Sequence, residues 1–215
     1  MPLMGVYSYF RLKSGKLLAP KKRRYASMIA LQCLLLVMSW EVTHQNRLQF
    51  FFNTSGLAAW MWIASAAWLA LVALRLKSGW RRITPERRQR ARLSLPENTS
   101  DLRYWIPISL LAGIAEEWAY RGVAYVMLWR TTRSQALSVL VCVLAFGTAH
   151  MFQGWRGVLG TSLLAVFFHG LVYFTQTLYL VMAIHAAYDV IVGVIGMRML
   201  GGETAASVPE TQAAS

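Results

Sequence analysis

Charge is scarce in this chain. Only 14% of its 215 residues are Asp, Glu, Lys or Arg, whereas a soluble domain of this size carries about 25%. Hydrophobic residues make up 56% of the sequence, and the mean hydropathy is +0.41. So few charges cannot cover a water-facing surface, and a disordered chain would be poorer in apolar and aromatic residues. The composition therefore excludes most soluble folds and predicts a polytopic membrane protein.

Cysteine is also nearly absent. The two cysteines, Cys33 and Cys142, each lie inside an apolar run, and no residue near either has metal-ligand spacing. This pattern argues against a disulfide framework and against a cysteine-based zinc site. We predict that both are small packing residues.

The apolar runs predict an all-α transmembrane bundle of about six spans. The expected spans are 25–40, 48–74, 104–129, 134–151 and two within 156–198, divided at 175–177. No small-x-small cleavage site follows the first run, so we interpret it as a retained span and not as a signal peptide. We expect four parts: a basic segment (1–24), two spans with a solvated basic loop (25–103), a core (104–200) and a disordered tail (201–215).

Basic residues orient the predicted spans. Of the 22 Lys and Arg residues, seven precede the first span and nine lie within 75–103, between the second and third. Because cytoplasmic loops are enriched in Lys and Arg, both segments and both termini are predicted to be cytoplasmic. We expect the basic segments to meet anionic lipid headgroups, and we do not expect nucleic acid as a partner.

Several ionisable residues lie inside the predicted spans, where a charge costs about 2.5 to 3.5 kcal/mol and usually marks a functional site. They are Glu116, Glu117, Arg121, His150, His169, His185 and Asp189. The alternative is that they only join helices through polar contacts, an explanation that stays open above all for Glu117 and Arg121.

Helical spacing suggests separate roles for the two adjacent acids. Glu117 and Arg121 are four residues apart and can form an ion pair on one helix face. Glu116 lies about 100° around the helix and is the unpaired acid, so we predict that it is the proton acceptor. The reverse assignment, with Glu117 as the base, is the alternative.

The same spacing relates residues of the later spans. Asp189 lies one turn after His185 and can fix the tautomer of its imidazole. Phe146 lies one turn before His150 and can form a wall of the same site. His169 has no acid within one turn, and we interpret it as structural.

Three segments together resemble a known family. Residues 116–121 read EEWAYR, residues 146–150 read FGTAH and residues 185–189 read HAAYD. In this order, each within an apolar span, they resemble the EExxxR, FxxxH and HxxxN or HxxxD motifs of the CPBP (ABI) family of intramembrane proteases. That family includes CAAX prenyl endopeptidases and bacterial proteins linked to bacteriocin processing and immunity. The resemblance covers roughly residues 104–200.

The resemblance implies an intramembrane endopeptidase that acts on a membrane-associated protein or peptide. Glu116 would activate a water molecule, His150 and His185 would position that water or stabilise the oxyanion, and Asp189 would complete the site. Asp189 stands where the prenyl endopeptidases carry Asn. We expect an integral protein of a bacterial cytoplasmic membrane, with a water-filled site open to the cytoplasmic half of the bilayer.

The donor set leaves metal binding open. Two histidines and a carboxylate suffice for catalytic zinc, but the chain has no HExxH motif. We expect no cofactor, and a zinc-dependent protease with the same residues is the alternative. The buried polar residues are also compatible with a proton relay or transporter and with a non-catalytic immunity or adaptor protein.

Overall fold

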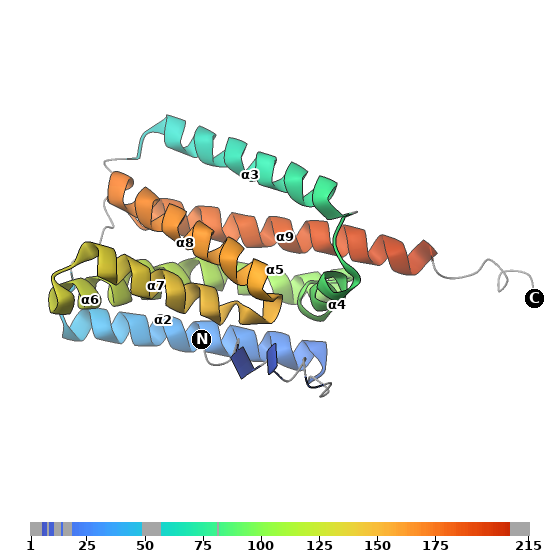
Figure 1. The fold of residues 1–215 in the computed structure, drawn as a ribbon, viewed down its shortest axis with the longest axis horizontal. Helices are drawn as coiled ribbons and strands as arrows, with labels where there is room; N and C mark the ends of the chain where they lie inside the picture. Colours follow the sequence, from blue (N-terminus) through green and yellow to red (C-terminus); the bar gives the residue numbers. More distant parts are fainter. Residues whose placement is uncertain are drawn as a thin grey trace, which may run out of the picture.

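All regular elements of the described residues are helices, which confirms the predicted all-α class (Figure 1). The computed structural model describes residues 6–7, 9–10, 14, 19–48, 57–80 and 82–206. The helices are α2 (Lys21–Gln45), α3 (Ala59–Trp80), α4 (Pro85–Ser94), α5 (Thr99–Glu117), the π-helix η1 (Trp118–Ala124), α6 (Tyr125–Thr132), α7 (Gln135–Ala149), the 3₁₀-helix η2 (Met151–Gln153), α8 (Trp155–Thr175) and α9 (Tyr179–Ala206).

Four helical segments are long and apolar enough to cross a bilayer, namely Lys21–Gln45, Ala59–Trp80, Trp155–Thr175 and Tyr179–Gly201. Helix α7 is apolar but shorter. Helices α5, η1 and α6 follow one another without a break over residues 99–132. Within the described part of the chain these make six helical segments, in agreement with the predicted bundle.

Two predicted segments need correction here. The second helix runs from Ala59 to Trp80 instead of 48–74, and residues 49–56 lie outside the described residues. The segment 75–103, predicted as a solvated loop, contains the end of α3, all of α4 and the start of α5. The polar composition gave no apolar periodicity from which α4 could be predicted. Thr84 is the N-cap of α4, because its side chain accepts a hydrogen bond from the backbone nitrogen of Arg87.

The predicted disordered tail also begins too early. Helix α9 continues through Ala206, and residues 207–215 lie outside the described residues. The predicted division at residues 175–177 is confirmed, because α8 ends at Thr175 and α9 begins at Tyr179. Gln176 makes this break possible by adopting a left-handed conformation with φ of 52°.

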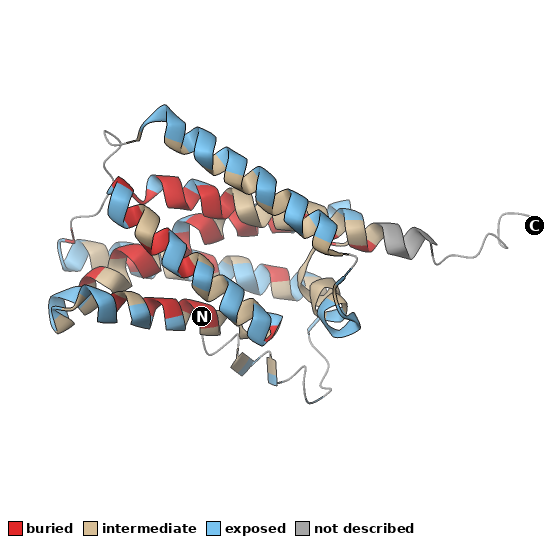
Figure 2. Cartoon of the chain, turned by 45° about the horizontal axis from the view of Figure 1, so that its top comes forward, coloured by how far each residue is buried: buried red, intermediate tan, exposed pale blue. Residues whose placement is uncertain are grey.

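Helix α5 lies between α2 and α9 and packs along both (Figure 1). Tyr25 of α2 and Trp105 and Ile108 of α5 form one buried cluster. Helix α7 packs on α8, while α3 lies outermost on α9 and has no buried residue (Figure 2). Burial is therefore concentrated along α5 and the first half of α9, and the outer faces are apolar and exposed, as expected for contact with lipid.

The two cysteines differ in their environment. Cys142 of α7 is buried, as predicted for a packing residue. Cys33 is exposed, so its predicted packing role is wrong. Its neighbours Leu34 and Val37 are exposed too, because this side of α2 faces away from the bundle.

Gly113 sets the distance between α5 and α9. A β-carbon at this position would lie 2.8 Å from the carbonyl oxygen of Met182 and 2.8 Å from the backbone nitrogen of Ala186. The two backbones thus approach as closely as only glycine permits. Glu117 lies one turn after Gly113, and His185 adjoins Ala186, so this contact brings the polar motifs of the two helices together.

Substituting Gly113 should therefore loosen the bundle. We expect Gly113→Ala to lower the stability of the protein in detergent, because overpacking a tight contact costs about 1–3 kcal/mol. The matched control is Gly160→Ala in α8, where a β-carbon meets no atom within 4 Å. That change should be neutral or stabilising, since Ala favours the helix by about 1 kcal/mol. Equal unfolding midpoints for the two variants in detergent would contradict the contact.

Candidate active site

The two adjacent acids end α5 and point to different neighbours. Both are buried, with Glu116 8% exposed and Glu117 fully enclosed. Glu116 accepts a hydrogen bond from Gln32 Nε2 of α2 at 2.6 Å. Glu117 faces Arg121 and His185 instead. Adjacent residues of a helix point about 100° apart, so one carboxylate is directed to α2 and the other to α9.

Glu117 forms the predicted ion pair and one contact that spacing did not predict. Arg121 Nη1 donates to Glu117 Oε1 at 2.9 Å, and His185 Nδ1 lies 2.7 Å from the same oxygen. A carboxylate is only an acceptor, so Nδ1 of His185 carries a proton. Glu117 therefore anchors the arginine of its own helix and the histidine of α9 at one point.

Arg121 is held by aromatic rings as well as by charge. Its guanidinium carbon lies 4.6 Å from the centre of the Phe146 ring and 5.6 Å from that of Phe168. The side chain is 1% exposed. Cation–π contacts of this kind stabilise a desolvated guanidinium. Phe146 of α7 and Phe168 of α8 therefore help to hold the charged side chain of Arg121 in place.

Phe146 joins the two histidine motifs. Its ring centre lies 4.7 Å from that of His150 and 6.1 Å from that of His185. The rings of Phe146 and His150 are thus in contact, as their spacing of four residues predicted. His150 caps the C-terminal end of α7, and its Nδ1 lies 2.9 Å from the carbonyl oxygen of Phe146. Since that oxygen only accepts, Nδ1 is protonated and Nε2 of the neutral ring is left as an acceptor.

Asp189 lies on the more open side of this group. Its Oδ2 is 3.6 Å from His185 Nε2, and its side chain is 27% exposed. Trp105 of α5 donates from Nε1 to the backbone oxygen of Asp189 at 2.8 Å, which fixes this turn of α9. Phe146 contacts both His150 and His185, and Glu116 adjoins Glu117, which bonds to His185. Glu116, His150, His185 and Asp189 therefore lie in one region, between α5, α7 and α9.

A π-helical turn follows the two glutamates. The seven residues Trp118–Ala124 form η1 within an otherwise α-helical stretch. Such turns occur often at functional sites, because the wider turn changes the direction of the side chains around it. Here Tyr120 of η1 packs edge-on against Phe146 with ring centres 5.2 Å apart. Nothing in the sequence pattern indicated this turn.

Sequence reasoning missed three residues that complete the site. They are Gln32, Trp105 and Phe168. Gln32 carries a recognisable signal, since it is an amide in the middle of an apolar run. His169, interpreted as structural, is buried beside Tyr125, with ring centres 5.7 Å apart.

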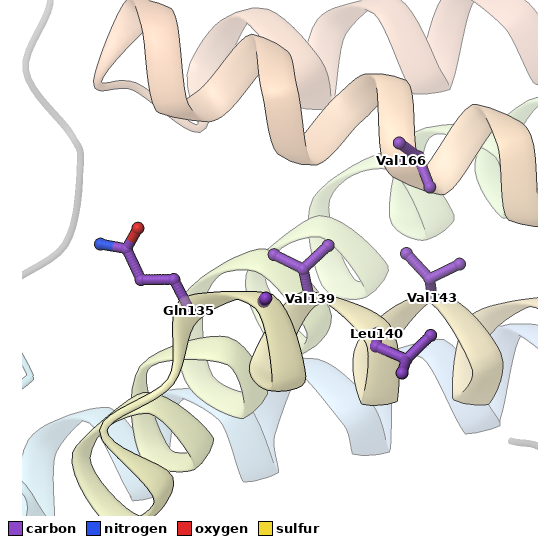
Figure 3. Close-up of a pocket in the computed structure, with 6 residues that line it drawn as sticks. Gln135, Val139, Leu140, Val143 and Val166 are labelled. Atoms are coloured by element: carbon purple, nitrogen blue, oxygen red, sulfur yellow. The ribbon is translucent and has the colours of Figure 1, made fainter.

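An apolar pocket with a volume of about 460 Å³ lies near this group, between α7 and α8. Figure 3 shows Gln135, Val139, Leu140 and Val143 of α7, with Val166 of α8 across from them. Val143 also packs with Phe146 and Tyr120 in a buried cluster. The pocket thus borders the aromatic wall of the site, but no carboxylate or histidine lines it.

The described residues contain no group of three His, Cys, Asp or Glu side chains in a metal-ligand arrangement. The ring nitrogens of His185, for example, face other side chains: Glu117 contacts Nδ1 and Asp189 faces Nε2. The imidazole of His185 is therefore placed between two carboxylates, one hydrogen-bonded to Nδ1 and one 3.6 Å from Nε2.

Comparison with protein families gives one match. Residues 98–191 match the family described as type II CAAX prenyl endopeptidase Rce1-like. The matched segment begins at the N-cap of α5 and ends within α9, so it contains the three motifs and leaves out α2 and α3. Searches of curated proteins and of solved structures found no match.

The contacts of the two acids predict different effects on stability. Glu117→Gln should destabilise the protein by about 3–5 kcal/mol, because it leaves the buried Arg121 without its counterion. Glu116→Gln should cost less than about 1 kcal/mol, since an amide oxygen still accepts from Gln32. The free energy of unfolding of each variant and of the wild type, measured in mixed micelles, gives the two losses. Equal losses would contradict the separate roles of the two acids.

Proposed function

Since residues 98–191 match the Rce1-like family of type II CAAX prenyl endopeptidases, which is part of the CPBP family that the three motifs resemble, we propose that this integral membrane protein is an intramembrane endopeptidase. It hydrolyses a peptide bond in a membrane-associated protein or peptide. The observation that carries the proposal is that contacts link the three motifs: Glu117, next to Glu116, bonds to His185, Phe146 packs on both His150 and His185, and Asp189 lies 3.6 Å from His185. A set of polar groups purely for helix association would not need two imidazoles beside two unlike carboxylates.

Glu116 is the base in this proposal. Arg121 and His185 both contact the carboxylate of Glu117. Among the described residues, the hydrogen-bond partner found for Glu116 is the neutral amide of Gln32. A carboxylate that is not neutralised by a cation is the one free to take a proton from water. The contacts therefore favour Glu116 over the reverse assignment.

The reaction adds water across the peptide bond. Glu116 removes one proton from a water molecule, and the resulting hydroxide attacks the carbonyl carbon to give a tetrahedral oxyanion. The C–N bond then breaks as the nitrogen takes the proton from Glu116. The products are a new carboxylic acid and a new amine, and Glu116 returns to its starting state.

The histidines and Asp189 assist by positioning the reactants and by stabilising the oxyanion. With Nδ1 bound to the carbonyl oxygen of Phe146, His150 keeps Nε2 as an acceptor that can help to position the reactants. Glu117 holds Nδ1 of His185, which leaves Nε2 between Asp189 and the site. In its protonated form that nitrogen is suited to stabilise the oxyanion, a contribution typically worth a few kcal/mol.

The basic end of the bundle supports the proposed orientation. Lys21 of α2 bonds to Glu97 and Asp101 at 2.7 and 3.2 Å, which places the start of α2 beside the start of α5. Arg90 of α4 lies against Gly154 before α8. We propose that this end lies in the cytoplasm of a bacterial cell, at anionic headgroups of the cytoplasmic membrane, with both termini on that side.

We further propose that hydrolysis proceeds without zinc. The two ring nitrogens of His185 face Glu117 at 2.7 Å and Asp189 at 3.6 Å, and Nδ1 of His150 faces a carbonyl. A zinc ligand needs a nitrogen lone pair directed at the metal. Nδ1 of each histidine is therefore engaged, and Nε2 of His185 has no lone pair to offer zinc in the protonated form that we propose beside Asp189.

The central test is Glu116→Gln, which nearly conserves volume and removes the base. The probe is a farnesylated peptide that ends in a CAAX sequence, presented to the purified protein in lipid vesicles, with mass spectrometry of the products. We expect the cleavage rate to fall at least about 100-fold, because general base catalysis contributes a factor of about 10² to 10⁴. Membrane proteins of the host, compared between wild type and Glu116→Gln, should differ in processed peptides.

The matched control is Glu41→Gln, an exposed acid of α2 that accepts from Gln45. It should cleave as the wild type does. Equal insertion and equal processing by wild type and Glu116→Gln would refute the protease proposal. Cleavage of host proteins without cleavage of the farnesylated peptide would preserve the protease and exclude the prenylated substrate.

Metal dependence has its own measurement. We expect a chelator titration to leave the cleavage rate unchanged and metal analysis of the purified protein to find much less than one zinc per chain. The reason is that the proposed base is a carboxylate acting directly on water. Stoichiometric zinc whose removal abolishes cleavage would overturn this proposal.

A further inference from the structure

Gln32 is a polar residue in an apolar helix outside the segment that matches the family. It lies in the middle of α2, where residues 28–38 are otherwise apolar or small, and it is 4% exposed. The family match begins only at residue 98. An amide at this depth in a membrane helix is costly and calls for a partner.

One end of the amide binds the proposed base. Gln32 Nε2 donates to Glu116 Oε1 at 2.6 Å, across 84 residues of sequence. An ionised carboxylate accepts hydrogen bonds and cannot donate them, so the amide must turn its NH₂ group toward Glu116. The bond fixes the carboxylate against α2 and leaves its remaining lone pairs for other donors.

The other end of the amide has no partner among the described residues. Gln32 Oε1 is buried and accepts no hydrogen bond there. A buried carbonyl oxygen without a donor is unfavourable, and in proteins such groups usually bind an ordered water. Since the two polar atoms of one amide are neighbours, a water bound to Oε1 lies beside the carboxylate of Glu116.

A role limited to helix association explains only half of this arrangement. The Nε2 bond would join α2 to α5 whatever the state of Oε1. Association gains nothing from a buried acceptor that is left open, whereas a water site next to a base needs one.

We propose that Gln32 is a positioning residue for hydrolysis: its Nε2 holds the Glu116 carboxylate, and its Oε1 accepts a hydrogen from the water that Glu116 deprotonates. This inference rests on the proposed function of Glu116. One O–H of the water points to Glu116 and the other to Gln32 Oε1, so the oxygen lone pair is left for the carbonyl carbon. Helix α2 is then part of the catalytic unit.

The test compares Gln32→Leu, which keeps a similar volume and removes both polar atoms, with Ser39→Ala. Ser39 is equally buried on the same side of α2, two turns later, and has no part in the site. With the farnesylated peptide in vesicles, we expect Gln32→Leu to lower kcat by about 10- to 100-fold with KM unchanged, because a misplaced catalytic group loses up to about 10²-fold. Ser39→Ala should keep both constants.

Infrared spectra give a readout that does not depend on cleavage. The carboxylate stretching band that disappears in Glu116→Gln should shift in Gln32→Leu and stay in place in Ser39→Ala. An unshifted band in Gln32→Leu would overturn the contact, and a shifted band with wild-type kcat would overturn the positioning role. If Glu116→Gln itself cleaves at the wild-type rate, the proposed function fails first, and the role of Gln32 fails with it.

Discussion

The site depends on the carboxylate of Glu117. This one group accepts from Arg121 at 2.9 Å and from His185 at 2.7 Å, on a side chain with no solvent exposure. A charge buried in a membrane bundle is tolerable only when it is paired and hydrogen-bonded. Glu117 Oε1 pairs the acid with the arginine and the imidazole at once, although Glu117 Oε2 and Arg121 Nε and Nη2 have no partner among the described residues. The neighbouring Glu116 is left to a different partner.

Packing around this carboxylate explains why four elements must come together. Phe146 of α7 and Phe168 of α8 cover the guanidinium of Arg121, and Gly113 lets α9 approach α5 closely enough for His185 to reach Glu117. Trp105 holds the backbone of Asp189 one turn further along α9. Apolar packing and charge pairing are therefore not separate features here, because the aromatic residues of the core also surround the charge.

The sequence predicted the contacts that lie within one helix and missed those between helices. Spacing by four residues is enough to pair Glu117 with Arg121 and Phe146 with His150, because the geometry of one helix fixes both. Contacts such as Gln32 with Glu116 depend on how each helix is rotated about its axis, and spacing carries no record of that rotation. The same holds for the π-helical turn after Glu117, which sequence periodicity does not indicate.

The helix boundaries were predicted well where apolar runs end at turn formers, and poorly where polar segments are themselves helical. Helix α4 and the last turns of α9 belong to the second case. Apolar periodicity identifies helices by the face they bury, and a basic helix at a membrane surface buries little.

Helix α7 has 15 residues, which at about 1.5 Å per residue makes it shorter than the roughly 30 Å of hydrocarbon in a typical bilayer. Local thinning of the bilayer is one way in which a membrane accommodates a short hydrophobic element. His150 stands at the end of this helix, and the lipid–water boundary therefore comes closest to the reacting groups there. With such thinning, a polar peptide segment that reached the site along α7 would cross less hydrocarbon than one that followed a full-length helix such as α8 or α9.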